Sequence, residues 1–179
     1  MTTQITQHYW WTMFVRGGIA LLFVLTVFFL TLAVAGLVHL VGVYMLLDGL
    51  VLILVAMQGR QFLVLWWLFL LEGILGVALS MPLLIWQNMS VDTLFTFIAI
   101  RAILTAIFEF AATFSAYDMF SGGWLLVLGA IISLMLGILC LYIQPVMADG
   151  LIAAIGVVGC YVLVCGVVWM ICAFQVRWV

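Results

Sequence analysis

The stretch Ile-Ala-Ile-Arg-Ala-Ile-Leu-Thr-Ala-Ile-Phe-Glu-Phe, residues 98–110, places Arg101 and Glu109 inside an otherwise apolar segment. A charge at bilayer depth costs about 2.5 to 3.5 kcal/mol on insertion scales, so it is normally paired or faces a cavity. Partners for Arg101 are few, because among the acidic residues outside this stretch only Asp48 and Glu72 lie well inside apolar segments. We therefore expect one of these two carboxylates to pair with Arg101 and the helices to be arranged accordingly.

The composition is that of a membrane protein. Of the 179 residues, 70% are hydrophobic and 6% charged, whereas soluble proteins average about 25% charged residues. A spanning helix needs about 20 apolar residues, so this length permits six spans with short connections. The net charge of −2, with four arginines and no lysine, is too weak a field to favour nucleic-acid binding. We expect an all-α polytopic protein, a single membrane domain over residues 1–179, whose main partner is the lipid bilayer.

Interruptions in the apolar pattern divide the chain into six expected transmembrane helices. Pro82 lies near the end of the third, where a proline can bend or stop a helix. Ser90 or Asp92 can cap the start of the fourth. The expected spans cover about residues 13–34, 40–57, 62–85, 93–115, 124–143 and 151–174.

The arginines predict the orientation of these spans. If all six cross the membrane, Arg16, Arg60 and Arg177 fall at ends that face one side. The opposite turns contain no lysine or arginine and carry Asp92 and Asp149. By the positive-inside rule, both termini then face the cytoplasm.

An internal repeat divides the chain into three helical hairpins, about residues 10–60, 61–118 and 119–179. A glycine recurs at a spacing of 56 residues, each time shortly after tryptophan, at Gly17, Gly73 and Gly129. The second halves of the first and third hairpins align at a spacing of 117 residues, with Tyr44, Gly49 and Arg60 recurring as Tyr161, Gly166 and Arg177. All three hairpins would enter the membrane from one side, so they are parallel repeats and not an inverted pair.

These motifs together resemble the HdeD family of small bacterial acid-resistance membrane proteins. The resemblance covers nearly the whole chain and rests on the Trp-to-Gly start of each hairpin, the Tyr44 to Asp48-Gly49 motif, Pro82, Pro145, and the run Gly156, Tyr161, Gly166 and Arg177. The chain departs from the pattern at Thr105, where the other repeats have glycine, and in a first hairpin without proline. The resemblance implies six spans in the bacterial cytoplasmic (inner) membrane and a role in acid resistance, and it supplies no catalytic residues.

The five charged residues at membrane depth, Asp48, Glu72, Arg101, Glu109 and Arg16, form a candidate buried polar network. Arg101, Asp48 and Glu72 can all reach a layer about 12 to 15 Å from a helix end, whereas Glu109 and Arg16 lie nearer the cytoplasmic face. One interpretation is a proton-responsive relay; the other is a static set of ion pairs that fixes the hairpins in one register. The static interpretation is favoured, because a proton pathway needs polar steps to both surfaces and few precede Arg101.

Small residues four apart, Gly129, Ser133 and Gly137, form a candidate helix-packing face on the fifth span. Such faces let helix backbones approach closely. Packing within the chain's own hairpins is the default expectation. A homo-oligomer interface or a docking surface for another membrane protein is the alternative.

His39 is a candidate pH-responsive residue, expected in the turn between the first two spans. Histidine gains a proton just below neutral pH, although a lone histidine is more often an ordinary turn residue.

The remaining chemistry-bearing residues favour no catalytic or metal site. The four cysteines lack a C-x-x-C pair or a histidine cluster and are expected to be small buried hydrophobic residues; they are Cys140, Cys160, Cys165 and Cys172. The sequence contains no nucleophile paired with a base, no phosphate loop and no two-histidine spacing. We therefore expect neither an enzyme nor a bound cofactor.

Three functions remain open. The first is a non-enzymatic membrane protein of the HdeD type, acting in acid-stress resistance or envelope maintenance. The second is a small accessory subunit of a larger membrane complex, and the third is a proton or small-solute permease.

Overall fold

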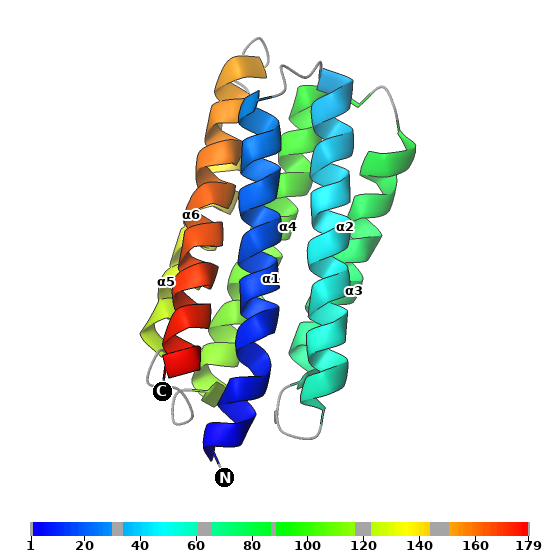
Figure 1. Cartoon of the computed structure of the whole chain (residues 1–179). Coiled ribbons are helices and arrows are strands. Elements are labelled where there is room, and N and C mark those ends of the chain that lie inside the picture. Colours follow the sequence, from blue (N-terminus) through cyan, green and yellow to red (C-terminus); the bar gives the residue numbers. More distant parts are fainter. Residues whose placement is uncertain are drawn as a thin grey trace.

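The computed structural model describes residues 2–29, 34–60, 66–86, 89–116, 123–143 and 151–178. This part of the chain is helical apart from a few residues at helix ends, which confirms the all-α prediction (Figure 1). The helices are α1 (Thr2–Phe29), α2 (Val34–Gly59), α3 (Trp66–Ile85), α4 (Val91–Ala116), α5 (Gly123–Ile143) and α6 (Leu151–Trp178). Pro145 and Asp149, on which the family resemblance and the orientation partly rest, lie outside the described residues.

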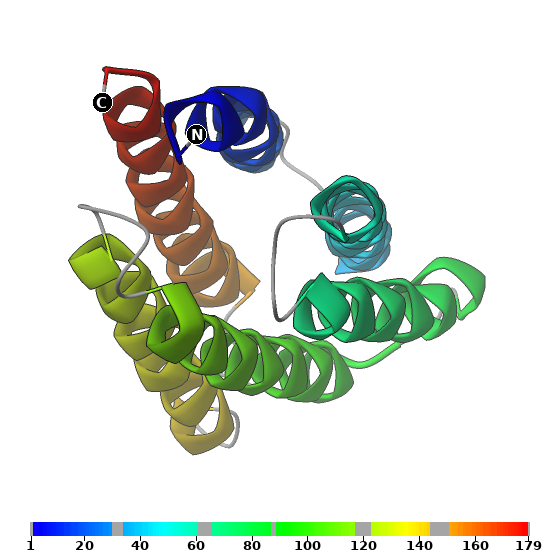
Figure 2. The same ribbon diagram turned by 90° about the horizontal axis from the view of Figure 1, so that it is seen from below.

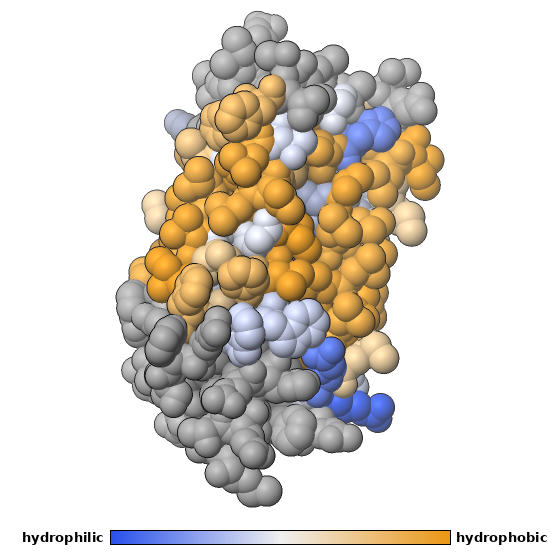
Figure 3. Space-filling model, in the orientation of Figure 1, coloured by the Kyte–Doolittle hydropathy of each residue, from blue (hydrophilic) through white to orange (hydrophobic). Residues whose placement is uncertain are grey.

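Three helices contain stretches that are long and apolar enough to cross a membrane. Within the described residues these are Gly36–Gly59, Trp66–Ile85 and Val91–Ala111, and shorter apolar stretches occupy Met13–Phe29, Val127–Tyr142 and Val158–Ile171. Large apolar side chains cover much of the outer surface over the middle of the bundle (Figure 3). Phe29, for example, is 83% exposed and Met135 67% exposed. Such a surface suits hydrocarbon, where helices satisfy their own backbone polar groups.

The helix boundaries differ from the expected spans most at α1, which begins at Thr2 and not near residue 13, and at the first turn. α2 begins at Val34, so His39 lies inside this helix and not in a turn, as expected from the sequence. Pro82 lies within α3, which continues to Ile85 because a proline near a helix end disrupts few hydrogen bonds. Ser90 caps α4, as predicted, by accepting a hydrogen bond from the amide of Thr93 at 3.3 Å.

The six helices form a ring in which close packing pairs each helix with one neighbour (Figure 2). The most extensive contacts join α2 with α3, α4 with α5, and α1 with α6, and contacts within α1–α2, α3–α4 and α5–α6 are sparser. The hairpins expected from the repeat are therefore not the tightly packed pairs. Instead, the first helix of each repeat packs against the second helix of the preceding repeat, and α1 closes the ring on α6.

Glycines of the repeat explain this arrangement. A Cβ atom on Gly73 of α3 would lie 2.8 Å from the carbonyl oxygen of Gly49 on α2, and one on Gly17 of α1 would lie 3.0 Å from the carbonyl oxygen of Gly166 on α6. Without side chains at these positions the backbones approach closely, and van der Waals packing drives helix association in lipid. The glycines found by their regular spacing are thus the contact points between repeats.

The small residues of α5 likewise contact a helix from outside their own hairpin. A Cβ atom on Gly137 would lie 3.2 Å from the carbonyl oxygen of Ala99 on α4. The carboxyl group of Glu109, also on α4, lies against Gly129. Ser133 contacts its hairpin partner α6, with its hydroxyl 3.3 Å from that of Tyr161. The two glycines of this face therefore pack against α4 of the preceding hairpin, and the serine against α6 of its own.

Gly73→Ala should destabilise the bundle by about 1–3 kcal/mol, the usual cost of overpacking, because its Cβ would collide with backbone atoms of Gly49 and Ile53. Gly18→Ala is the matched control, since no atom lies within 4 Å of a Cβ atom there. Thermal unfolding in detergent measures both variants. Equal stability of the two would contradict a glycine-mediated contact between α2 and α3.

Candidate functional site

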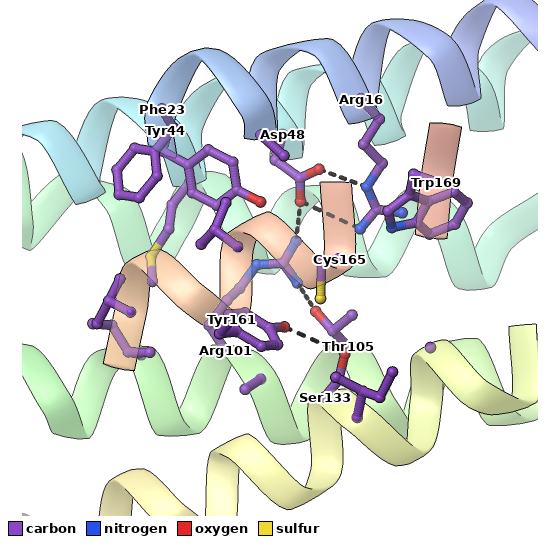
Figure 4. Close-up of a pocket in the computed structure, with 18 of the residues that line it drawn as sticks. Arg16, Phe23, Tyr44, Asp48, Arg101, Thr105, Ser133, Tyr161, Cys165 and Trp169 are labelled. Carbon is purple, nitrogen blue, oxygen red and sulfur yellow. Dashed lines mark hydrogen bonds and ion pairs between the residues drawn. The ribbon is translucent and has the colours of Figure 1, made fainter. Parts of the chain in front are cut away.

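Arg101 of α4 lies at the centre of an ion-pair cluster (Figure 4). Its Nη2 donates to Oδ2 of Asp48 on α2 at 2.7 Å, and its Nη1 lies 3.3 Å from Oε1 of Glu72 on α3. Nη1 also donates to the hydroxyl of Thr105 at 2.6 Å, one turn along the same helix. The sequence left the partner of Arg101 open between Asp48 and Glu72, and the structure brings both carboxylates to it.

Arg16 of α1 adds a fourth helix to the cluster. Its Nε donates to Oδ1 of Asp48 at 2.6 Å, and its Nη2 lies 3.6 Å from Oε1 of Glu72. The guanidinium stacks over the ring of Trp169 on α6, 4.3 Å from the ring centroid, which adds a cation–π interaction. Each carboxylate is therefore shared by two guanidinium groups, and the side chain of Glu72 is only 1% exposed.

The glycine contacts bring these charges together. Arg16, Asp48 and Glu72 each precede a repeat glycine in the sequence, namely Gly17, Gly49 and Gly73. Gly49 and Gly73 meet each other and Gly17 meets Gly166 of α6, so each of these charged residues is one position away from a close backbone contact. Buried charges are tolerable only when they are paired and hydrogen-bonded, and these meet that condition.

A cavity of about 70 Å³, which we call the central cavity, lies beside the cluster, in the part of the bundle where α4, α5 and α6 face α1 and α2. Its polar lining includes Tyr44, Glu109, Ser133, Tyr161 and Cys165 together with Arg16, Asp48, Arg101 and Thr105. A water molecule requires about 10–15 Å³ measured in this way, so the cavity has room for several. The hydroxyl and carboxyl groups on its wall supply the polar partners that such water needs.

Glu109 lines this cavity but belongs to no ion pair that the described residues form. The residue is 5% exposed, and its Oε2 has no hydrogen-bond partner among the described residues. A Cβ atom on Gly129 of α5 would lie 3.3 Å from that oxygen. Of the five residues in the predicted polar network, Glu109 is therefore the one that forms no ion pair among the described residues.

The other sequence candidates are divided between the cavity and the rest of the bundle. Gly129 and Ser133 line the cavity, whereas His39 and Gly137 are not part of its lining. The cysteine prediction is wrong for Cys160, which is exposed on the surface of α6, while Cys140 is buried and Cys165 lines the cavity. The side chain of Cys172 lies outside the described ones. Among the described residues, no group of three or more His, Cys, Asp or Glu side chains could hold a metal ion.

The sequence interpretation missed two contributors, Thr105 and Trp169, and the pairing of Tyr161 with Ser133. Thr105 could have been found, because residues four apart share one face of a helix and it follows Arg101 at that distance. Trp169 could not have been found from the sequence, because the chain contains eight tryptophans. The packing of α6 against α1 is what brings Trp169 to Arg16.

Comparison with known proteins agrees with the repeat. Residues 15–82 and 71–142 each match the family described as a short repeat of unknown function (DUF308). The two matches begin 56 residues apart, the spacing that separates Gly17 from Gly73. No curated protein and no solved structure matches the chain.

Arg101→Leu should destabilise the protein by about 3–5 kcal/mol, the usual cost of removing one partner from a buried ion pair. It leaves two carboxylates with Arg16 as their remaining guanidinium partner. Adding Glu72→Gln restores the balance of one guanidinium and one carboxylate, so the double variant should recover part of the loss. Thermal unfolding and membrane abundance measure both.

The control for this pair is Arg60→Lys, because Arg60 is exposed and outside the cluster and lysine keeps its positive charge. Its stability should stay close to that of the wild type. If Arg101→Leu were as stable as this control, the ion pairs would not hold the bundle together.

Proposed function

This chain belongs to the DUF308 family of short-repeat proteins, and on that premise we propose that it is a non-enzymatic integral membrane protein that supports acid-stress resistance or envelope maintenance. The role is the one implied by the resemblance to the HdeD family. The same resemblance implies six spans in the bacterial cytoplasmic membrane. The ring of apolar helices supports this setting, because its outer surface suits lipid and the four ion-paired side chains lie inside.

The ion-pair cluster is the observation that carries the proposal. Asp48 and Glu72 are each shared by Arg16 and Arg101, so one cluster ties α1, α2, α3 and α4 together. A carboxylate that is paired with two guanidinium groups is stabilised in its charged form. Such pairs keep the four helices joined as the proton concentration rises, which supports a role for the protein under acid stress.

The orientation that we propose has both termini in the cytoplasm. The start of α1 and the end of α6 lie at the same end of the bundle (Figure 1). Arg16 is not among the positive charges at the cytoplasmic side, because its side chain turns inward to Asp48. Arg60, which is exposed, and Arg177 remain as the positive charges that favour the cytoplasmic side.

A permease for protons or a small solute is the second candidate, and the central cavity is the observation that favours it. The accessory-subunit alternative loses one argument, because Gly129 and Gly137 of the small-residue face contact α4 of the same chain. Reconstituted liposomes test the permease by flux. Stoichiometric co-purification with unrelated chains tests the subunit.

Deletion of the gene should lower survival of an acid challenge, and expression of the wild type or of Arg60→Lys should restore it. The double variant Arg101→Leu/Glu72→Gln should be present in the membrane yet restore survival poorly, because it lacks the shared carboxylate–guanidinium contacts. Counting viable cells after acid exposure, with membrane abundance measured in parallel, checks both. Unchanged survival of the deletion strain would remove the acid-stress role.

A further inference from the structure

Glu109 is a buried carboxyl group to which the ion pairs of the described residues give no role. It is 5% exposed, lines the central cavity, and its Oε2 lies without a hydrogen-bond partner among the described residues. Burying a polar group without a compensating hydrogen bond costs free energy, and burying a charge in this way costs far more. The structure therefore places a carboxyl group where its charged form needs a counter-charge and its neutral form does not.

The charges around Glu109 are already balanced without it. Two guanidinium groups, those of Arg16 and Arg101, face the two carboxylates of Asp48 and Glu72. With Glu109 ionised, these five groups carry a net charge of −1; with one proton on Glu109, they are neutral. A single positive charge is what the site lacks.

Each helix around the cavity contributes to the setting of Glu109. The charged and titratable groups that face it are Arg16 from α1, Tyr44 and Asp48 from α2, Glu72 from α3 through the cluster, Arg101 from α4, and Tyr161 and Cys165 from α6. α5 contributes the bare backbone of Gly129 and the hydroxyl of Ser133. All the carboxylates among these groups are already engaged with guanidinium groups, so none of them competes with Glu109 for a proton without breaking an ion pair.

We propose that Glu109 is a proton-binding site served by water in the central cavity. The carboxylate takes one proton from a hydronium ion in the cavity, which leaves a water molecule and a neutral carboxylic acid. Because Oε2 is sealed against Gly129, the proton resides on Oε1, and Oε2 remains as the carbonyl oxygen. The cavity's 70 Å³ accommodates the water that delivers and removes the proton.

A proton fits the site better than a metal cation of the same charge. A bound cation needs several oxygen ligands, whereas the cavity wall also carries the guanidinium groups of Arg16 and Arg101, which would repel it. A proton needs only the carboxyl group itself. The inference rests on the proposed acid-stress function for its biological use, but its test measures the carboxyl group directly.

Infrared difference spectroscopy of the purified protein in lipid nanodiscs tests the proposal. As the pH is lowered, the wild type should gain a carboxylic-acid carbonyl band at the high-frequency position of an acid whose carbonyl accepts no hydrogen bond. A carboxylic acid whose carbonyl accepts hydrogen bonds absorbs at lower frequency. The band should be absent from Glu109→Gln, persist in Asp92→Asn, and shift in D₂O because cavity water exchanges the proton.

Gly129→Ala provides a second variant that keeps the carboxyl group. Its Cβ would lie 3.3 Å from Oε2, so the band should move in frequency while remaining present. This result would tie the band to the contact between α4 and α5. An unmoved band in this variant would place the absorbing acid elsewhere and overturn the assignment.

Three other results would overturn the proposal. They are a high-frequency band that survives in Glu109→Gln, a band that does not shift in D₂O, and a band that sodium chloride abolishes at constant pH, which would assign the site to a metal cation. Wild-type survival of acid challenge by a strain carrying Glu109→Gln would count against the biological use alone. A negative spectroscopic result would therefore overturn the proton-binding site, whereas a negative survival result would overturn only its role in acid resistance.

Discussion

The sharing of Asp48 and Glu72 between Arg16 and Arg101 is the constraint on which the rest of the bundle depends. Lipid tails are as apolar as leucine, so no hydrophobic force selects which helices meet in a membrane. Close backbone contact supplies attraction, but similar glycine contacts recur around the ring. The charges add selectivity, because any arrangement that separates them leaves a guanidinium or a carboxylate unpaired at bilayer depth.

The repeat is symmetric in its glycines and asymmetric in its charges. Arg16 and Glu72 precede equivalent glycines in the first two repeats, and Leu128 takes that position in the third. Opposite charges thus occupy equivalent positions on α1 and α3, where Asp48 and Arg101 link them. The third repeat contributes no ionised partner at this position, and the cavity with Glu109 lies on its side of the bundle, against Gly129.

The structural role of the ion pairs and the proton-binding role that we propose for Glu109 therefore concern different residues. The four paired groups hold helices together, and removing any one of them leaves an uncompensated charge. Glu109 makes no such pair among the described residues, so a change in its protonation leaves the ion pairs intact. A bundle can in this way keep a fixed structural cluster and a separate group that responds to protons.

The sequence by itself determined the helices and the candidates for the cluster. Long apolar runs leave little alternative to helix, Ser90 is a good capping residue, and so few charges lie at depth that Arg101 had only two carboxylate partners to choose from. The tertiary structure alone decided that each helix packs across repeats, because a recurring glycine fits a neighbour in its own hairpin as well as one in the next. It also decided the cavity and the isolation of Glu109, since both depend on side chains converging from helices far apart in the chain.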